Sequence, residues 1–361
     1  MHLSKRERLA RLAFQHLFGT TPKFAADLIR YFGSAHVCFE TSHEIMRPLF
    51  GEKEQLWKEF STFQKWEQCE EEEKWYAQQG VHVLTQENDL YPSLVKEIFD
   101  PPLLLFAQGE LSLLQQPAIA LVGSRKASAH GLRVAYELAV DLASLGFVIV
   151  SGMAYGIDAV VHRGALSAKG KTIAVWGTGI DRPYPVEHST LAHEIAAAGL
   201  LLTEFPRSTS AKAHHFPQRN RIISGLCVAT IIVEAAAKSG SLITAQYALD
   251  QGRLVFALPG TPRNVFTSGN NRLLKEGALF AETADDILEH VTTQLTPQHT
   301  SETKKAGHSL KLPVKAKSFS LEDYVTQHQL SPSQAGEYLS EMILNGKIRE
   351  LPGKRFEVVS S

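Results

Sequence analysis

The feature that most constrains the fold is an alternation of apolar strands and amphipathic helices between residues 118 and 291. The predicted strands are Ala118–Val122, Phe147–Val150, Thr172–Trp176, Leu200–Thr203, Val228–Val233, Leu254–Leu258 and Ala278–Phe280. Helical segments lie between them, among them Leu132–Leu145, Ile157–Ser167, His188–Ala198 and Leu242–Asp250. Continuously apolar strands that alternate with helices indicate a mostly parallel sheet covered on both faces. We therefore predict a doubly wound, Rossmann-like α/β domain that holds its ligand at the carboxyl ends of its strands.

Glycine-rich and basic segments follow the predicted strands. They are Gly123-Ser124-Arg125-Lys126, Ser151-Gly152-Met153-Ala154-Tyr155-Gly156-Ile157-Asp158, Gly177-Thr178-Gly179-Ile180-Asp181 and Lys238-Ser239-Gly240-Ser241. Glycines let backbone amides approach an anion closely, and helix N-termini add a favourable dipole. Any one of these segments alone is typical of an ordinary tight turn. Their convergence on one sheet edge indicates a pocket for a polyanion or a nucleotide.

The run from His214 to Gly225 adds cations and an aromatic ring to this edge. Its sequence is His-His-Phe-Pro-Gln-Arg-Asn-Arg-Ile-Ile-Ser-Gly. The guanidinium groups of Arg219 and Arg221 suit phosphate oxygens, and the flat face of Phe216 suits a base. The alternative is a capped helix start, with Pro217 in the first turn and the arginines solvated.

Composition and missing motifs exclude several classes of protein. A net charge of −1 argues against a uniformly basic nucleic-acid binder, although not against a local basic pocket. The first strand is not followed by G-x-G-x-x-G, and the sequence contains no G-x-x-x-x-G-K-[ST], so neither a dinucleotide oxidoreductase nor a P-loop ATPase is favoured. The cysteines Cys38, Cys69 and Cys227 lie far apart, and the histidines lack metal-ligand spacing, so we expect no metal and no cofactor. Without a signal core or a membrane span, the protein is expected to be cytoplasmic.

The segments that flank the α/β region predict further domains. Residues 1–75 have helical periodicity and predict either a plain packing domain of the SAM-like kind or a small module that binds the DNA backbone. Residues 76–117 are expected to be a connector with two short strands, and residues 118–291 the Rossmann-like domain. Residues 292–317 are polar and predict a linker. Residues 318–361 have a helix–turn–helix and hairpin pattern, the outline of a winged helix that binds either DNA or protein.

Taken together, these motifs resemble those of the DprA/Smf family. The resemblance also covers Tyr184-Pro185 and the run from Gly269 to Ala278, and it extends over about residues 118–291. It implies a cytoplasmic DNA-processing protein of natural transformation, or competence, that binds and shields incoming single-stranded DNA. It further implies that the protein loads the RecA recombinase onto strands coated by single-strand binding protein, works as a homodimer and has no catalytic turnover.

The resemblance, with the pocket argument, gives a set of candidate DNA-binding residues. They are Gly123, Ser124, Arg125, Ser151, Gly152, Lys212, His215, Phe216, Arg219, Asn220, Arg221, Lys238, Ser239 and Gly240. The chain departs from the family pattern at three positions. Ala213 stands where some members have lysine, which leaves open whether Lys212 replaces it. Tyr155 stands where many members have arginine, and His188 where many have asparagine.

Two further questions stay open at this stage. Leu273, Leu274, Ile287 and Leu288 could supply a two-fold interface, or could simply pack against the last strands.

The main alternative function is that of a nucleotide-cleaving enzyme related to the nucleoside-monophosphate phosphoribohydrolases. The Pro-Gly-Gly-x-Gly-Thr loop of those enzymes is missing here, because the corresponding segment reads Lys238-Ser239-Gly240-Ser241-Leu242-Ile243-Thr244. A regulator that acts through the winged helix would leave the central pocket unexplained.

Overall fold

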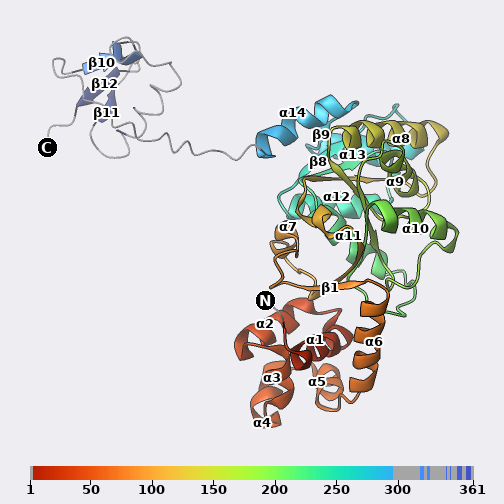
Figure 1. The fold of residues 1–361 in the computed structure, drawn as a ribbon. Helices are drawn as coiled ribbons and strands as arrows, with labels where there is room; N and C mark the ends of the chain where they lie inside the picture. The colour runs from red at the N-terminus through yellow and green to blue at the C-terminus, as the bar shows by residue number, and fades with distance from the viewer. Residues whose placement is uncertain are drawn as a thin grey trace. The chain divides into compact units, whose positions relative to one another are not determined.

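The structure is a computed structural model that divides into two compact units, Met1–Thr296 and Pro297–Ser361. It describes residues 3–295 of the first unit and, in the second, residues 318–320, 323–325, 339, 342, 348–351 and 355–358. Figure 1 shows the course of the chain. No helix among the described residues is long and apolar enough to cross a membrane.

The N-terminal region is helical, as predicted. Its elements are α1 (Lys5–Phe18), α2 (Pro22–Phe32), α3 (Ala35–Glu40), α4 (His43–Met46), η1 (Arg47–Phe50), α5 (Glu54–Ser61) and α6 (Trp66–Gln78). Aromatic rings fill the space between these helices: Phe14 makes edge contacts with Phe18, Phe39 and Phe60, and Phe60 in turn contacts Phe18 and Phe39. Rings in such arrangements contribute beyond the area they bury, so this cluster is the core of the helical region.

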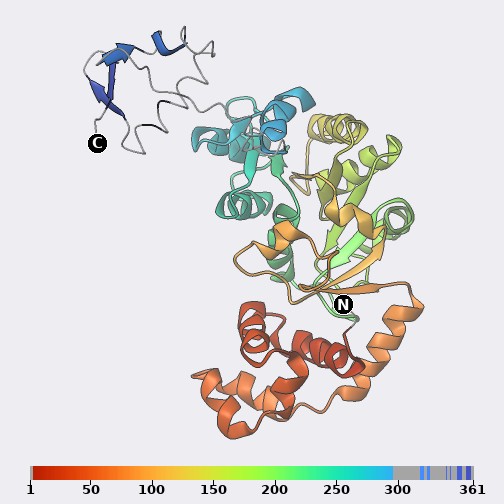
Figure 2. The same ribbon diagram turned by 60° about the vertical axis from the view of Figure 1, so that its left-hand side comes forward.

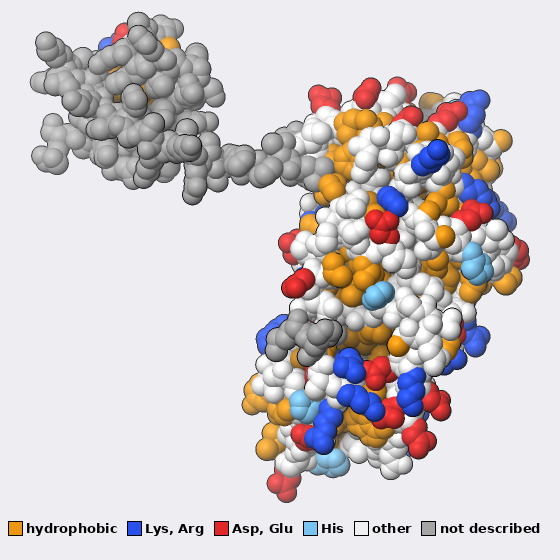
Figure 3. Space-filling model, viewed as in Figure 1, with side chains coloured by type: hydrophobic (Ala, Val, Ile, Leu, Met, Phe, Trp, Pro, Cys, Tyr) orange, Lys and Arg blue, Asp and Glu red, His pale blue; other side chains and the backbone are white. Residues whose placement is uncertain are grey.

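The helix start that could bind a DNA phosphate is already used inside the protein. The backbone amide of Lys23, in the first turn of α2, donates to the carboxylate of Asp100 at 3.2 Å. A carboxylate at a helix N-terminus is stabilised by the same dipole that would attract a phosphate. This contact favours the packing role of the helical region. On the face shown in Figure 3, lysines and arginines of this region lie beside acidic side chains. Ion pairs in this region include Lys5–Glu70 and Arg8–Glu73.

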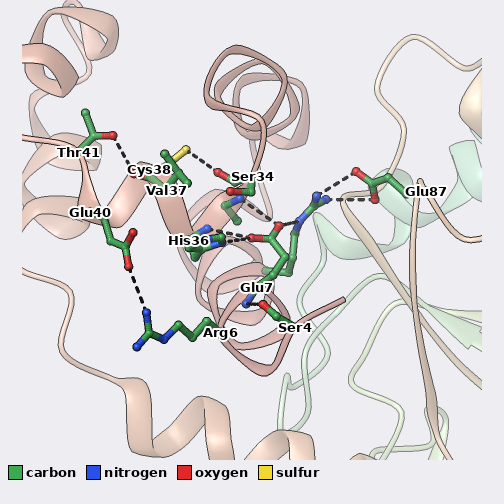
Figure 4. A network of polar contacts seen from close by, with 12 residues as sticks. Ser4, Arg6, Glu7, Ser34, His36, Val37, Cys38, Glu40, Thr41 and Glu87 are labelled. Carbon is green, nitrogen blue, oxygen red and sulfur yellow. Dashed lines mark hydrogen bonds and ion pairs between the residues drawn. The ribbon is translucent and has the colours of Figure 1, made fainter. Parts of the chain in front are cut away.

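A buried carboxylate joins the helices of this region (Figure 4). Glu7, on α1, accepts hydrogen bonds from the backbone amides of Ala35 and His36 at the start of α3 and from the Arg11 guanidinium at 2.5 Å. Arg11 in turn donates to both carboxylate oxygens of Glu87, at 3.3 and 2.9 Å. Burial works to raise the pKa of Glu7, but these donors outweigh it and hold the pKa below its usual range. The network fixes α3 on α1 and ties both to the loop that carries Glu87.

The central sheet has nine strands in the order β1-β2-β6-β5-β4-β3-β7-β8-β9. The strands are β1 (His82–Thr85), β2 (Leu104–Gly109), β3 (Ala118–Val122), β4 (Val148–Ser151), β5 (Thr172–Trp176), β6 (Leu200–Thr203), β7 (Ala229–Ile232), β8 (Leu254–Ala257) and β9 (Leu279–Phe280). Neighbours from β6 across to β9 pair in parallel, for example Ile119 of β3 with Ala229 of β7. The mostly parallel, Rossmann-like sheet is therefore confirmed.

The segment predicted as a connector carries two strands of this same sheet. β2 pairs antiparallel with β6, in the register Phe106 with Thr203, and β1 pairs antiparallel with β2. Short elements flank them, namely α7 (Ser93–Lys96) and η2 (Leu111–Gln115). The prediction found both strands but not their partners, because pairing between β2 and β6 joins residues about a hundred positions apart.

Helices cover both faces of the sheet (Figures 1 and 2). They are α8 (Ala129–Ser144), α9 (Ile157–Ser167), α10 (Ser189–Ala198), α11 (His215–Gly225), α12 (Ser241–Asp250), α13 (Ser268–Lys275) and α14 (Ala284–Leu295), with the short turns η3 (Val186–His188) and η4 (Val265–Thr267). One apolar cluster joins α8, α9 and α14 to the sheet, and another joins α7, α11, α12 and α13 to it. The two clusters form the predicted layers of a doubly wound fold.

In the second unit the structure describes a three-stranded antiparallel sheet. Its order is β10 (Ser318–Ser320), β12 (Arg355–Val358), β11 (Ile348–Leu351). Phe319, Tyr324, Leu339 and Ile348 are buried together. The pairing of β11 with β12 agrees with the predicted hairpin. Its turn and most of the residues of the predicted helices lie outside the described residues.

Candidate nucleic-acid interface

A cavity of about 860 Å³ lies at the carboxyl ends of the central strands. Most of the predicted DNA-binding residues line it, namely Gly123, Ser124, Arg125, Lys212, Phe216, Arg219, Asn220, Lys238, Ser239 and Gly240. They come from the loops after β3 and β7, from the segment before α11 and from α11 itself. The carboxyl edge of the parallel strands thus brings together residues more than a hundred positions apart, as expected for this fold.

Hydrogen bonds to Glu234 hold the loop that carries Arg125 in place. The backbone amide of Ser124 donates to the Glu234 carbonyl at 2.7 Å, and Ser128 donates to the Glu234 carboxylate through its amide and its hydroxyl. Gly156, with φ of 76°, lies so close that an added Cβ would be 2.3 Å from the carbonyl oxygen of Ser124. The loop is therefore held on both sides while the Arg125 side chain remains exposed.

Arg125, Phe216 and Tyr184 lie in contact with one another in the cavity, with Phe216 in the middle. The Arg125 guanidinium lies over the Phe216 ring at 5.2 Å, and the Tyr184 ring lies 5.3 Å from Phe216 at an interplanar angle of 37°. The backbone at Gly177 presses on the same ring, because an added Cβ there would be 3.1 Å from it. Phe216 is consequently half-buried, whereas Tyr184 remains 44% exposed and lines the cavity.

The exposed cations around the cavity are not neutralised. Among the described residues, Arg125, Lys126, Lys212 and Lys238 have no acidic partner within ion-pair distance. Asp158 also lines the cavity, but it is buried and accepts a hydrogen bond from the Gly152 amide at 3.2 Å. Burial raises the pKa of Asp158 against the opposing charge of Arg219. The mouth of the cavity is therefore cationic, and unpaired cations suit an anionic ligand.

Arg219 lines the cavity from a buried position. Its guanidinium donates to the carbonyl of Gly152 at 2.8 Å and to that of Val175, and its Nε donates to Asn220 Oδ1 at 3.2 Å. Burial lowers the pKa of Arg219 to about 10, so the group remains charged at neutral pH. Arg219 therefore joins the ends of β4 and β5 to α11 and contributes charge beneath the cavity floor.

The other predicted residues do not line the cavity, which corrects the expectation that the whole set faces one pocket. The Ser151 hydroxyl is buried and donates to the Leu121 carbonyl at 2.7 Å. Gly152 packs against Arg219, where an added Cβ would be 2.2 Å from the guanidinium. His215 is buried against Phe205 with ring centroids 4.3 Å apart.

Arg221 is also absent from the cavity lining. It forms two 2.8 Å bonds to the carboxylate of Glu204, and both side chains are nearly inaccessible, at 7% and 1% exposure. Burial raises the pKa of Glu204, and Arg221 is the main group that opposes this rise. Two side chains that are two positions apart on a helix point in nearly opposite directions. Arg219 therefore lies at the cavity, while Arg221 lies in the core.

The cavity also contains residues that the sequence-based list lacked. Among them are Lys126, Tyr184, Ile243, Val265 and Phe266. Tyr184-Pro185 was noted as a motif but not as a binding residue. Val265 and Phe266 form an apolar pair within an otherwise polar turn segment that follows a strand. This pair was the sequence signal that could have indicated a binding role for the two residues.

The structure brings together the two aromatic positions at which the chain departs from the family pattern. The rings of Tyr155 and His188 lie 5.1 Å apart in an edge contact. The Tyr155 hydroxyl donates to Glu187 at 2.6 Å, and His188 Nδ1 lies 2.9 Å from the Met153 carbonyl oxygen. This pair joins the loop after β4 to the segment that carries Tyr184.

The proposed interface leucines and isoleucine have core positions. Leu273 and Ile287 are buried, and Leu274 and Leu288 pack against the two apolar clusters of the sheet. Their contacts match the packing alternative rather than a free surface.

Among the described residues, the serines that line the cavity are not paired with a histidine. The Ser241 hydroxyl pairs with that of Ser239 at 2.8 Å, and no histidine lines the cavity. No cluster of three or more potential metal ligands occurs among the described residues.

A Rossmann-like domain with a cationic, aromatic cavity at its strand ends defines a protein of the phosphate- or nucleic-acid-binding class. Comparison with known proteins identifies the family: residues 82–292 match the model of DNA recombination-mediator protein A. The chain belongs to this DprA/Smf family of DNA-processing proteins, which confirms the resemblance.

Individual relatives support the assignment. The DNA processing protein DprA of Bacillus subtilis is 42% identical over 217 residues, which cover 60% of this chain and 73% of the relative. The solved structure of Streptococcus pneumoniae DprA has a TM-score of 0.69 and 34% identity, and the match covers 80% of this chain and 99% of that one. The DNA processing protein A of Helicobacter pylori, whose solved structure concerns its single-stranded DNA binding mode, has a TM-score of 0.52 and 31% identity over 59% of this chain and 96% of its own.

Proposed function

We propose that this protein binds single-stranded DNA in the cavity at the carboxyl edge of the sheet. The observation that carries the proposal is the combination, in one cavity, of unpaired cations with the neighbouring aromatic rings of Phe216 and Tyr184. Cations hold the phosphate backbone, while aromatic faces stack bases with little sequence preference. The single-stranded DNA binding mode of the Helicobacter pylori relative gives independent support.

The cavity favours a single strand over a duplex. Phe216 and Tyr184 can stack only on a base whose face is free, and the bases of a duplex are already stacked and paired. The backbone contacts come from Arg125, Lys126, Lys212 and Lys238, and Lys212 takes the role of the family lysine that is absent at Ala213. We assign Ser151, Gly152, His215 and Arg221 to the support of this surface, because their contacts are internal.

The proposed role in the cell is that of a non-catalytic mediator of natural transformation. It shields incoming strands and loads RecA onto DNA covered by single-strand binding protein, as the family resemblance implies. A homodimer would offer two such cavities to one strand and raise the avidity, because binding at the second cavity becomes intramolecular. The linker at 292–317 and the winged-helix domain at 318–361 complete the proposed domain organisation.

A titration with oligonucleotides tests the binding proposal. The protein is mixed with labelled single-stranded and duplex oligonucleotides of equal length at two salt concentrations. We expect tighter binding to the single strand and a loss of affinity with salt, because bound phosphates release counterions. Equal affinity for both forms would refute the single-strand preference.

Two further assays address the role. RecA filament formation on strands covered by single-strand binding protein should be faster when the protein is added, and light scattering should give a dimer. Incubation with nucleoside monophosphates should release no free base. A monomer that releases base and does not affect RecA would favour the phosphoribohydrolase alternative.

A further inference from the structure

The cavity has a second apolar wall that the proposed function does not use. Val265 and Phe266, in the turn η4 after β8, line the cavity and are 73% and 47% exposed. Ile243, in the first turn of α12, lines it as well and is 39% exposed. Large apolar side chains that are exposed together at the edge of a charged cavity indicate contact with a ligand rather than core packing.

The turn that carries this wall is held in place. The Asn264 side chain accepts a hydrogen bond from the Phe266 amide at 3.0 Å. The Ser268 hydroxyl donates to the Val265 carbonyl at 2.9 Å and accepts from the Ala237 amide at 3.0 Å. The turn is thereby anchored to the segment before α12, which carries Lys238. The exposure of Val265 and Phe266 therefore belongs to a turn whose backbone is fixed on both sides.

The loops that carry the two apolar walls follow strands on opposite sides of β3, the strand that precedes the cationic loop. Tyr184 follows β5 and Phe266 follows β8, whereas Arg125 and Lys126 follow β3, the middle strand of the series β5-β4-β3-β7-β8. With neighbouring strands about 4.8 Å apart, the ends of β5 and β8 are about 19 Å from each other. A stacked strand rises about 3.4 Å per nucleotide, so several nucleotides are needed to span the ends of β5 and β8.

We infer that Phe266, supported by Val265 and Ile243, is a second base-stacking site that holds a base several nucleotides away from the one at Tyr184. This inference rests on the proposed binding of single-stranded DNA. The strand crosses the cavity with its phosphates at Arg125, Lys126 and Lys238, between the two apolar walls. The side chains that form the two walls carry no charge, so they contact the bases of the strand rather than its phosphates. The neutral aromatic and aliphatic chemistry imposes no base sequence.

The inference predicts how affinity depends on oligonucleotide length. Affinity for deoxythymidine oligonucleotides is measured from two to about twelve nucleotides, for the full chain and for Phe266→Ala. The full chain should gain affinity until the strand reaches both walls. Phe266→Ala should match the full chain on the shortest strands and lose about five- to hundredfold on the longer ones, the range expected for the loss of one stacked base.

Two variants serve as controls. Phe280→Ala removes a phenylalanine of similar exposure, 51%, which does not line the cavity, and should bind like the full chain at every length. Phe266→Tyr keeps a ring and should restore binding on long strands. Melting temperatures of all variants should agree within a few degrees, because each changed side chain is largely exposed.

The outcomes separate this inference from the proposed function. If the full chain binds single strands and Phe266→Ala behaves like Phe280→Ala at all lengths, the second site does not exist, while the proposed function stands. An equal loss on the shortest and longest strands would place Phe266 in the same site as Tyr184 and would also overturn the inference. If the full chain binds no single strand at any length, both proposals fail.

Discussion

Replacement of Arg221 by methionine separates a structural role from a DNA-contacting one. Arg221 belongs to the run from which DNA contacts were expected, yet its guanidinium forms two 2.8 Å bonds to Glu204 inside the protein. Methionine keeps much of the apolar volume and removes the charge. The variant therefore leaves the Glu204 carboxylate, 1% exposed, without its counter-ion.

The expected loss of stability is large. Removing one partner of a buried ion pair costs about 3–5 kcal/mol, because the remaining charge stays desolvated. For larger domains each kcal/mol lowers the melting temperature by roughly 2–4 °C, so we expect a fall of about 6–20 °C. The matched control is Arg272→Met, in an exposed pair with Glu276, where the expected cost is about 1 kcal/mol or less.

The pH dependence of the loss gives a second signature. Without Arg221, burial raises the folded-state pKa of Glu204 above the ordinary value of about 4.3, opposed only by the smaller effect of the hydrogen bond with Gln218. Below about pH 4.3 the carboxyl is protonated in both states and the penalty is small; it grows as the pH rises through the raised pKa. Adding Glu204→Gln to Arg221→Met should recover much of the stability at neutral pH, since no buried charge remains.

Thermal denaturation at several pH values, followed by single-strand titration at a temperature where the variant is folded, measures both effects. We expect the folded variant to keep most of its affinity, because Arg221 does not line the cavity. An unchanged melting temperature together with a large loss of affinity would refute this reasoning and place Arg221 on the DNA.

Further predictions concern the cavity, the helical region and the linker. Arg125→Ala should weaken single-strand binding and reduce the slope of log affinity against log salt by about 0.7, whereas Arg163→Ala, an exposed arginine outside the cavity, should not. Glu7→Ala should cost about 1–3 kcal/mol, because buried donors lose their acceptor. The pKa of Glu7 is lowered in the folded state, so its contribution to the free energy of unfolding is present above about pH 4.3 and is lost as the pH falls through the lowered value. Urea denaturation at pH 7 and pH 3 measures this loss. Limited proteolysis should cut first within residues 292–317 and leave a folded fragment of about residues 1–291, and a chain that stays intact would contradict this boundary.

Local pattern was enough to predict most elements of the sheet. The strands at Thr172–Trp176 and Leu200–Thr203 and the helix at Ile157–Ser167 have the predicted bounds in the structure. These segments are apolar runs or periodic stretches bounded by glycine or polar turns, so their conformation follows from short-range preferences and burial. The order of parallel strands then forces their carboxyl ends, with Arg125 and Lys238, onto one edge.

Long-range pairing was not readable in the same way. The pairing of β2 with β6 depends on which strand edges come together in the folded protein. The residues of β2 and β6 do not by themselves indicate this pairing. The same holds for Glu7, whose acidic side chain alone would predict a solvated position on α1, whereas the start of α3 and Arg11 make it a buried acceptor.

The sequence by itself determined that this chain forms a Rossmann-like sheet with a cationic, glycine-rich edge, because periodicity and turn residues act over a few positions. Only the tertiary structure decided which members of that edge face the cavity. Arg219 and Arg221 differ by two positions on one helix, yet one lies under the cavity and the other is paired with Glu204, which the fold supplies from the end of β6. The physical reason is that a buried charge must be paired, and the folded layers decide which partner lies next to it. In the same way, Tyr184 and Phe266 line one cavity only because the strand order places the loops after β5 and β8 on either side of β3.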